Sequence, residues 1–264
     1  MRAIMQGTQE PQTELAARAL PAPLYRALRH IFAQRIKNCA LVGGTALAGY
    51  YAGHRRSDDL DLFAQDATAH RAAALAAKSL VSIGATCLET TSDTRQYART
   101  VWELNRHRFT VDIVLDANLF QVGRMVKLKD GVIVADLETL LKTKASTLVS
   151  RASEKDLYDL IWLFGAFPDL DFEKLIDLGR QIDSGLTGES ILISISGTTL
   201  SEEACEFAIG KKGIHPRSGR EIYNQVLKFR RELVRGVAAY LRKEPLPPLG
   251  ELVRSLEKSR KAAR

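Results

Sequence analysis

The feature that most constrains the fold is a turn of small residues followed by an acidic strand. Gly-Gly-Thr-Ala-Leu occupies positions 43–47, and Asp-Leu-Asp-Leu-Phe follows at positions 59–63. Because side chains alternate between the two faces of a strand, Asp59 and Asp61 would point one way while the leucines between them enter a core. The apolar residues 39–42 favour a short buried strand before the turn, and residues 45–51 favour a helix that begins at the glycines. We therefore expect two carboxylates beside a glycine turn.

Two carboxylates side by side are costly unless a cation neutralises them. Hard oxygen ligands of this kind suit Mg²⁺ together with substrate phosphates. The bare backbone of Gly43 and Gly44, with Thr45 at the start of the helix, would form an anion site because free amides and the helix dipole attract phosphate. Either pattern alone is compatible with a structural role. In this order they favour a metal-dependent nucleotidyltransferase that uses Mg²⁺ and a nucleoside triphosphate (NTP).

A third acid lies in a later strand candidate. Residues 108–115 alternate apolar and polar side chains, which leaves Asp112 among apolar neighbours. A carboxylate from an adjacent strand would join the face of Asp59 and Asp61 and complete a two-metal site, in which one ion activates the attacking oxygen and the other holds pyrophosphate. The alternative is an edge-strand acid that is exposed to water.

Periodicity along the chain predicts a mixed α+β fold. The expected helices cover residues 13–35, interrupted around two prolines, and 67–83, and the expected strands cover 85–89, 97–104 and 108–115. We expect a nucleotidyltransferase-fold sheet flanked by helices, followed by a mainly helical C-terminal region. The predicted domains are a helical N-terminal lead at 1–36, a nucleotidyltransferase core at 37–135 and a helical C-terminal domain with a basic tail at 136–264.

Two C-terminal segments carry more specific expectations. Residues 184–201 are rich in Gly, Ser and Thr, and the alternation of Ile191, Ile193 and Ile195 favours a short strand or an ordered loop. Residues 218–241 are the longest helix candidate, with a basic face opposite an apolar stripe. That stripe consists of Ile222, Val226, Phe229, Leu233 and Val237.

Two consecutive helices are also expected in the segment 136–164. Lys144 and Arg151 are seven residues apart and therefore share one helix face, and Asp156 and Asp159 are neighbours at i, i+3. The alternative is a pair between Lys155 and Asp159 on an exposed face, which would contribute roughly 0.2–0.5 kcal/mol.

The net charge of +7 is distributed unevenly. Residues 211–264 contain fifteen Lys and Arg against five Glu, a balance of +10, so the preceding 210 residues carry −3. Phosphate backbones provide most of the sequence-independent affinity of nucleic-acid binders, so this segment would attract a polyanion such as RNA. The alternative is a solvated helix face. The basic positions include Lys228, Arg230, Arg231, Arg235, Arg254, Lys258, Arg260, Lys261 and Arg264.

Composition argues against several other classes of protein. The three cysteines are odd in number and widely spaced, which indicates reduced core thiols rather than disulfides or a zinc site. The five histidines form no pair with the spacing of metal ligands. No apolar run is long enough to span a bilayer, and residues 1–10 lack the apolar segment of a signal peptide. A cytoplasmic protein that does not enter a membrane is therefore expected.

Four segments in order resemble one known family. They are Gly43 to Leu47, His54 to Phe63, Lys144 to Arg151 and Lys155 to Leu160. Together they resemble the AbiEii/AbiGii nucleotidyltransferase toxins, over about residues 41–164. The resemblance implies a fold of the DNA polymerase β type and a toxin of a type IV toxin-antitoxin or abortive-infection system, with a possible cognate antitoxin. Family members are thought to transfer nucleotides from an NTP, with tRNA acceptor ends as one target class.

The resemblance also implies roles for single residues. Gly43 and Gly44 would hold the phosphates, Ser57 would contact the nucleotide, and Asp59 with Asp61 would bind Mg²⁺.

In the helices, Lys144 would steady the triphosphate, and Arg151 is a further candidate for nucleotide binding. Asp159, with Asp156 as its neighbour, would position the acceptor or the Lys144 ammonium by charge pairing. Two other functions stay open: nucleotidyl transfer to a small molecule such as an antibiotic, and a catalytically silent module that binds a nucleotide or a partner.

Overall fold

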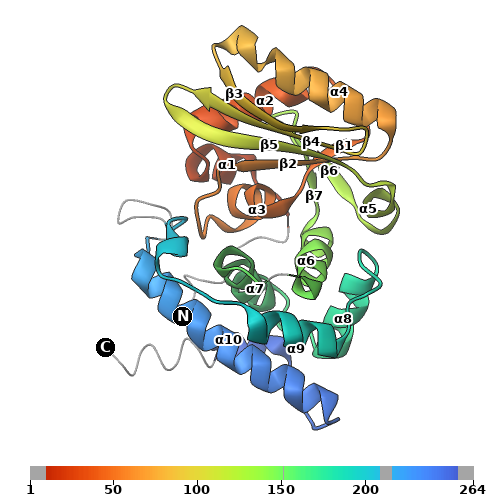
Figure 1. Ribbon diagram of the computed structural model, residues 1–264, viewed down its shortest axis with the longest axis vertical. Coiled ribbons are helices and arrows are strands. Elements are labelled where there is room, and N and C mark those ends of the chain that lie inside the picture. Colours follow the sequence, from red (N-terminus) through yellow and green to blue (C-terminus); the bar gives the residue numbers. More distant parts are fainter. Residues whose placement is uncertain (1–9, 151, 209–215, 255–264) are drawn as a thin grey trace. The chain divides into compact units, whose positions relative to one another are not determined.

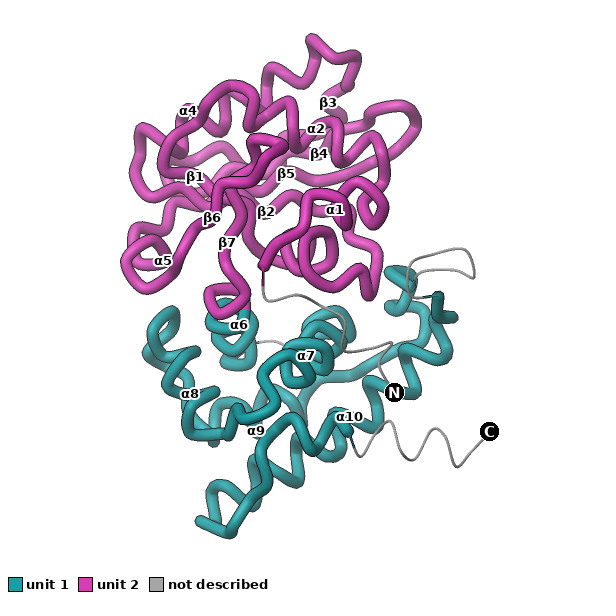
Figure 2. The backbone as a smooth tube through the Cα atoms, turned by 180° about the vertical axis from the view of Figure 1, so that it is seen from behind, with its two compact units in different colours: residues 1–7, 141–264 teal, residues 8–140 magenta. Residues whose placement is uncertain are grey.

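The computed structural model describes residues 10–150, 152–208 and 216–254. Contacts between Cα atoms divide the chain into two compact units, which Figure 2 shows in different colours. We call the described residues up to 140 the sheet unit and those from 141 onward the helical unit. The domain boundaries after residues 36 and 135 stay a prediction, although helices α1 (Thr13–Ala19) and α2 (Ala22–Ala33) belong to the same unit as the sheet.

Within the described residues, the sheet unit contains one seven-stranded mixed sheet with the order β3-β4-β5-β2-β1-β7-β6 (Figure 1). Strand β2 pairs in parallel with β5, and β1 pairs in parallel with β7, whereas the other neighbours are antiparallel. The bounds are β1 (Cys39–Leu41), β2 (Asp59–Ala64), β3 (Thr86–Asp93), β4 (Tyr97–Leu104), β5 (His107–Leu115), β6 (Met125–Lys127) and β7 (Ile133–Ala135). This confirms the mixed α+β fold.

Helices cover both faces of this sheet. Helices α2 and α4 (Ala67–Lys78) pack on one face, and α3 (Gly43–Ala46) lies on the other (Figure 1). Helix α3 continues as a π-helix, η1 (Leu47–Ala52), and α4 continues as a 3₁₀ helix, η2 (Ser79–Ile83). Every helix and strand predicted between residues 13 and 115 is present, with ends shifted by a few residues.

Three short elements of the sheet unit were not predicted. They are β6, β7 and helix α5 (Ala117–Val122). A strand of three residues is too short to show a period of two. Strand β7 is placed by its pairing with β1, where Leu41 is opposite Val134, and with β6. The alternation signal therefore cannot find such elements.

The helical unit begins within helix α6 (Leu137–Ser146), because the division between the units falls after Leu140. Its further elements are η3 (Thr147–Val149), α7 (Glu154–Ala166), α8 (Phe172–Arg180), α9 (Gly188–Gly197), η4 (Glu203–Cys205) and α10 (Gly219–Leu241). Helix α10 confirms the longest predicted helix, with Ser218 as its N-cap. All five residues of its apolar stripe are fully buried.

The segment around Ile193 is a helix, so the prediction of a short strand or loop was wrong. Thr187 caps α9 by accepting a hydrogen bond from the amide of Ser190, whose hydroxyl is in turn close to the Thr187 amide. Ile191 and Ile195 are buried one turn apart, while Ile193 is 75% exposed. The local capping box and the packing of one helix face outweigh the β preference of isoleucine.

The cysteine prediction needs one correction. All three thiols are free, but only Cys39 and Cys205 are buried, whereas Cys87 on strand β3 is exposed. Burial raises the pKa of Cys39 to about 12, so this thiol stays protonated and inert at neutral pH.

Among the described helices, none combines the length and the apolar character needed to cross a membrane.

Candidate active site

The two acids of strand β2 lie on one face of the sheet, as predicted. Asp59 and Asp61 are partly exposed, whereas Leu60 and Leu62 between them are fully buried. The parallel pairing with β5 sets Asp59 opposite Thr110 and Asp61 opposite Asp112. The Thr110 hydroxyl donates to Asp59 Oδ1 at 2.7 Å, which holds that carboxylate on the face it shares with Asp61.

The glycine turn packs directly against Asp59 and Asp61, which we call the acidic row. Gly43 has a φ of +65°, which favours glycine, and a Cβ atom there would overlap the carboxylate of Asp61. A Cβ atom on Gly44 would overlap the guanidinium of Arg55. The two glycines therefore let a carboxylate and a guanidinium approach the same turn.

The predicted nucleotide contacts Thr45 and Ser57 support the turn from inside. Both side chains are buried, and Thr45 Oγ1 lies 2.8 Å from Ser57 Oγ. The Thr45 hydroxyl also donates to the backbone carbonyl of Asp59. These bonds fix the start of strand β2 to helix α3. Contact of either residue with a nucleotide stays a prediction.

Arg55 is a residue of this site that sequence reasoning did not select. It is 3% exposed, and its Nη1 atom donates to the carbonyl of Arg56 at 2.8 Å. A buried guanidinium is rare unless it is paired, and this one lies against Gly44. Arg55 lies in the sequence between the glycine turn and the acidic strand, and this position was the signal by which it could have been selected.

Asp112 is not an exposed acid on an edge strand. It is 7% exposed on β5, which lies between β4 and β2. The Tyr97 hydroxyl donates to its Oδ1 at 2.5 Å, and Arg99 Nη1 lies 3.3 Å from both of its oxygens. Tyr97 and Arg99 were not selected from the sequence, because only the pairing of β4 with β5 brings them to Asp112. Its register sets Arg99 opposite Asp112 and Tyr97 opposite Val114, from where the Tyr97 hydroxyl reaches Asp112.

These contacts shift two pKa values. Burial and the hydrogen bond to Asp112 raise the pKa of Tyr97 above its usual value. Hydrogen bonding with Tyr97 and the charge of Asp112 raise the pKa of Arg99 above its already high value. Tyr97 is therefore neutral and Arg99 is charged at any pH at which the protein would act.

The residues fit a metal ion in part. Carboxylate oxygens such as those of Asp59 and Asp61 suit Mg²⁺, which commonly takes one or two carboxylates plus substrate phosphates. Among the described residues, however, no three His, Cys, Asp or Glu side chains are grouped closely enough to hold a metal ion. Asp112 as a third ligand therefore stays a prediction, and its contacts in the structure are with Tyr97 and Arg99.

The helical unit contains a second cluster, formed by Lys144 at the end of α6 and two acids of α7. Lys144 Nζ lies 2.9 Å from Asp156 Oδ1 and 2.8 Å from Asp159 Oδ2, and all three side chains are at least nine-tenths buried. The Ser153 hydroxyl donates to Asp156 Oδ2 at 2.6 Å. An exposed pair between Lys155 and Asp159 is excluded, because Asp159 is fully buried.

Several predicted residues lie outside the described part of the chain. They are Arg151 and the terminal basic residues Lys258, Arg260, Lys261 and Arg264. Their predicted roles stay predictions.

Comparisons with known proteins identify the family. The family described as "Nucleotidyl transferase AbiEii toxin, Type IV TA system" matches residues 26–189. That range includes both the acidic row and the Lys144 cluster. No curated protein sequence matches this chain significantly.

The solved structures that match this chain include two from Helicobacter pylori and one from Mycobacterium tuberculosis. An H. pylori protein described as a nucleotidyltransferase is 16% identical, with a TM-score of 0.43 over 81% of this chain and 95% of that one. The H. pylori protein JHP933 is 14% identical, with a TM-score of 0.45 over 85% and 97% of the two chains. The M. tuberculosis nucleotidyltransferase toxin MenT4 is 15% identical, with a TM-score of 0.43 over 97% and 99%. The family match covers more than half of this chain and includes both acidic clusters. This chain therefore belongs to the AbiEii family of nucleotidyltransferase toxins of type IV toxin-antitoxin systems.

Proposed function

We propose that this toxin transfers a nucleotide from an NTP to a hydroxyl group of RNA, with tRNA as the acceptor, in a reaction that depends on Mg²⁺. The observation that carries the proposal is the contact between the glycine turn and the acidic row, where the Asp61 carboxylate lies against Gly43. A phosphate at the turn and a cation at the acids would then be neighbours. As a type IV toxin, the protein has an antitoxin as its expected partner. We place its action in the cytoplasm, where NTPs and tRNA are found.

Asp59 and Asp61 would hold the metal ion. When bound, a divalent cation in such a site neutralises charge on the phosphates and lowers the barrier to substitution at phosphorus. The acceptor hydroxyl attacks the α-phosphorus and gives up its proton to water, and a new P–O bond forms. The bond from the α-phosphorus to the oxygen that bridges to the β-phosphorus breaks, and pyrophosphate leaves with the electrons of that bond. Positioning by the protein is the other main source of rate in this chemistry.

The chain's own residues would position the nucleotide. The backbone at Gly43 and Gly44, which has no side chain to keep phosphate away, would receive the triphosphate. Thr45 and Ser57 would hold the turn in register with β2 through their buried hydroxyls. In the helical unit, the bonds from Lys144 to Asp156 and Asp159 fix the direction of its ammonium. Its contact with the triphosphate is a proposal from the family motif.

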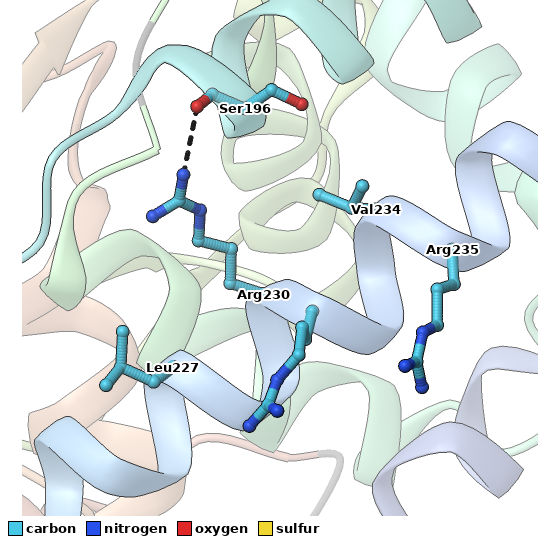
Figure 3. A pocket seen from close by; sticks show the side chains of 6 residues that line it. Ser196, Leu227, Arg230, Val234 and Arg235 are labelled. Atoms are coloured by element: carbon cyan, nitrogen blue, oxygen red, sulfur yellow. Dashed lines mark hydrogen bonds between the residues drawn. The ribbon is translucent and has the colours of Figure 1, made fainter.

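The basic face of α10 supports a polyanionic acceptor. A groove of about 500 Å³ runs along α10 beside α9 and is lined by three arginines, as Figure 3 shows for Arg230 and Arg235. Arg230 is held by the carbonyls of Ile195 and Ser196, each at 2.9 Å, so it also neutralises the C-terminal end of α9. A surface of this positive charge would attract the phosphates of RNA.

The test is incubation of the purified protein with Mg²⁺, each radiolabelled NTP in turn and total bacterial RNA, with separation of labelled RNA on a gel. We expect a labelled band of tRNA size that is absent with Asp59→Ala and in the presence of EDTA. Label on a small molecule with none on RNA would show that the acceptor is a small molecule and not RNA. Absence of transfer with every NTP would refute the proposed reaction.

A further inference from the structure

Arg99 on β4 completes a row that crosses one face of the sheet. In the strand register Arg99 pairs with Asp112, Asp112 pairs with Asp61, and Asp61 lies against Gly43. Residues paired on neighbouring strands share a face. The row therefore begins with a guanidinium, passes through two carboxylates, and ends at the glycine turn.

The contacts of Asp112 fix where this guanidinium lies. Arg99 Nη1 is 3.3 Å from both oxygens of Asp112, and the Tyr97 hydroxyl donates to one of them. The Asp112 side chain is 10% exposed, whereas that of Arg99 is 41% exposed. Asp112 is thus the anchored member of the pair, and Arg99 is the member that solvent and a ligand can reach.

A cation at this place has a clear electrostatic use. Both substrates of a nucleotidyl transfer carry phosphates, and these must approach a face that already carries acids. The arginine guanidinium is well suited to phosphate because its planar set of N–H donors can bind two oxygens at once. The glycine turn would bind phosphate at the end of the row near β1, and Arg99 would bind phosphate at the end on β4.

We propose that Arg99 binds a phosphate group of a substrate, either the NTP or the acceptor strand, and that Asp112 orients Arg99 for this contact. The proposal rests on the proposed function, which supplies both phosphate-bearing substrates. It makes Asp112 a positioning residue and not a third metal ligand.

Direct binding tests this without any transfer reaction. Inorganic tripolyphosphate and total tRNA are titrated separately, with Ca²⁺ present, into the wild type, Arg99→Ala, Arg99→Lys and Arg71→Ala. Arg71 is an exposed arginine on α4, which packs on the opposite sheet face, and serves as the matched control. For one probe we expect the affinity to fall about tenfold or more in Arg99→Ala, a typical effect of losing a charged hydrogen bond, to fall less in Arg99→Lys, and to stay unchanged in Arg71→Ala.

The probe that loses affinity identifies the source of the phosphate. Tripolyphosphate assigns Arg99 to the NTP, and tRNA assigns it to the acceptor. The proposal is overturned if Arg99→Ala binds both probes as tightly as the wild type does. It is also overturned if the wild type binds neither probe. Wild-type binding without transfer would refute the proposed reaction and leave this test intact.

A double-mutant cycle tests the role of Asp112. If Asp112 acts through Arg99, Asp112→Asn should show the binding defect of Arg99→Ala, and the double variant should be no worse than Arg99→Ala alone. If Asp112 binds metal, Asp112→Asn should instead raise the Mg²⁺ concentration needed for half-maximal transfer, and the double variant should bind the probe more weakly than Arg99→Ala alone, which would overturn the orienting role. Circular dichroism of each variant verifies that it folds.

Discussion

The two acidic clusters of this protein differ in how their charge is balanced. On β2, Asp59 and Asp61 are partly exposed on a sheet face beside the glycine turn. On α7, Asp156 and Asp159 are buried, and both pair with Lys144 Nζ. The first arrangement keeps its acids accessible to a ligand, whereas the second is closed by a side chain of the protein. We infer that changes in the first cluster mainly affect catalysis and that changes in the second also affect folding.

The largest expected effect breaks the cluster on β2. Asp59→Ala combined with Asp61→Ala should lower transfer by at least about 10²–10³-fold, because the proposed ligands of the cation that stabilises the reacting phosphates are lost. The fold should be retained, since partly exposed acids contribute little to the core. Radiolabel transfer and thermal unfolding measure the two effects. Asp93→Ala removes an exposed acid that pairs with Lys78 and should change neither.

Next in size is the break in the cluster on α7. Lys144→Met leaves two buried carboxylates without their shared cation, which should cost about 3–5 kcal/mol in the free energy of unfolding. Urea denaturation measures the loss. Lys155→Ala, on the exposed side of the same helix, should change stability by less than about 0.5 kcal/mol. Similar losses in both variants would contradict the buried triad.

Gly43→Ala separates backbone strain from damage to the acidic row. A left-handed φ costs alanine about 1–2 kcal/mol, and the added Cβ would also displace the Asp61 carboxylate. The control is Gly131→Ala, where φ is +87° but nothing lies within 4 Å of the added atom. Both variants should lose similar stability, and only Gly43→Ala should lose transfer. Equal transfer by the two would show that the turn does not support the acids.

The smallest expected effect sharpens the description of the helical cluster. Ser153 caps α7 and also donates to Asp156, so Ser153→Ala should cost about 1–2 kcal/mol in stability. Asp171→Ala removes only the cap of α8 and should cost about 1 kcal/mol or less. Chemical denaturation of both proteins gives the difference, which measures the bond to Asp156. No difference would mean that this bond is energetically neutral.

Local pattern was sufficient for the long elements. Strand β4 occupies the predicted residues 97–104, and α10 begins within one residue of the predicted start, because a pattern over eight residues and an apolar stripe over about four turns leave few alternatives. It failed for β6 and β7, which are too short to show a period, and for α9, where the predicted strand or loop is a helix that begins at a capping box.

The sequence by itself determined which residue types lie next to one another along the chain: the glycine turn, the two acids of β2 and the helical acids near Lys144. These follow from fixed spacing, because a strand repeats every two residues and a helix every 3.6. Only the tertiary structure decided that Arg99 and Tyr97 face Asp112, that Arg55 lies against Gly44, and that Lys144 joins both Asp156 and Asp159. Strand register and helix packing make those contacts, and both depend on how whole faces fit together, which no short stretch of sequence specifies.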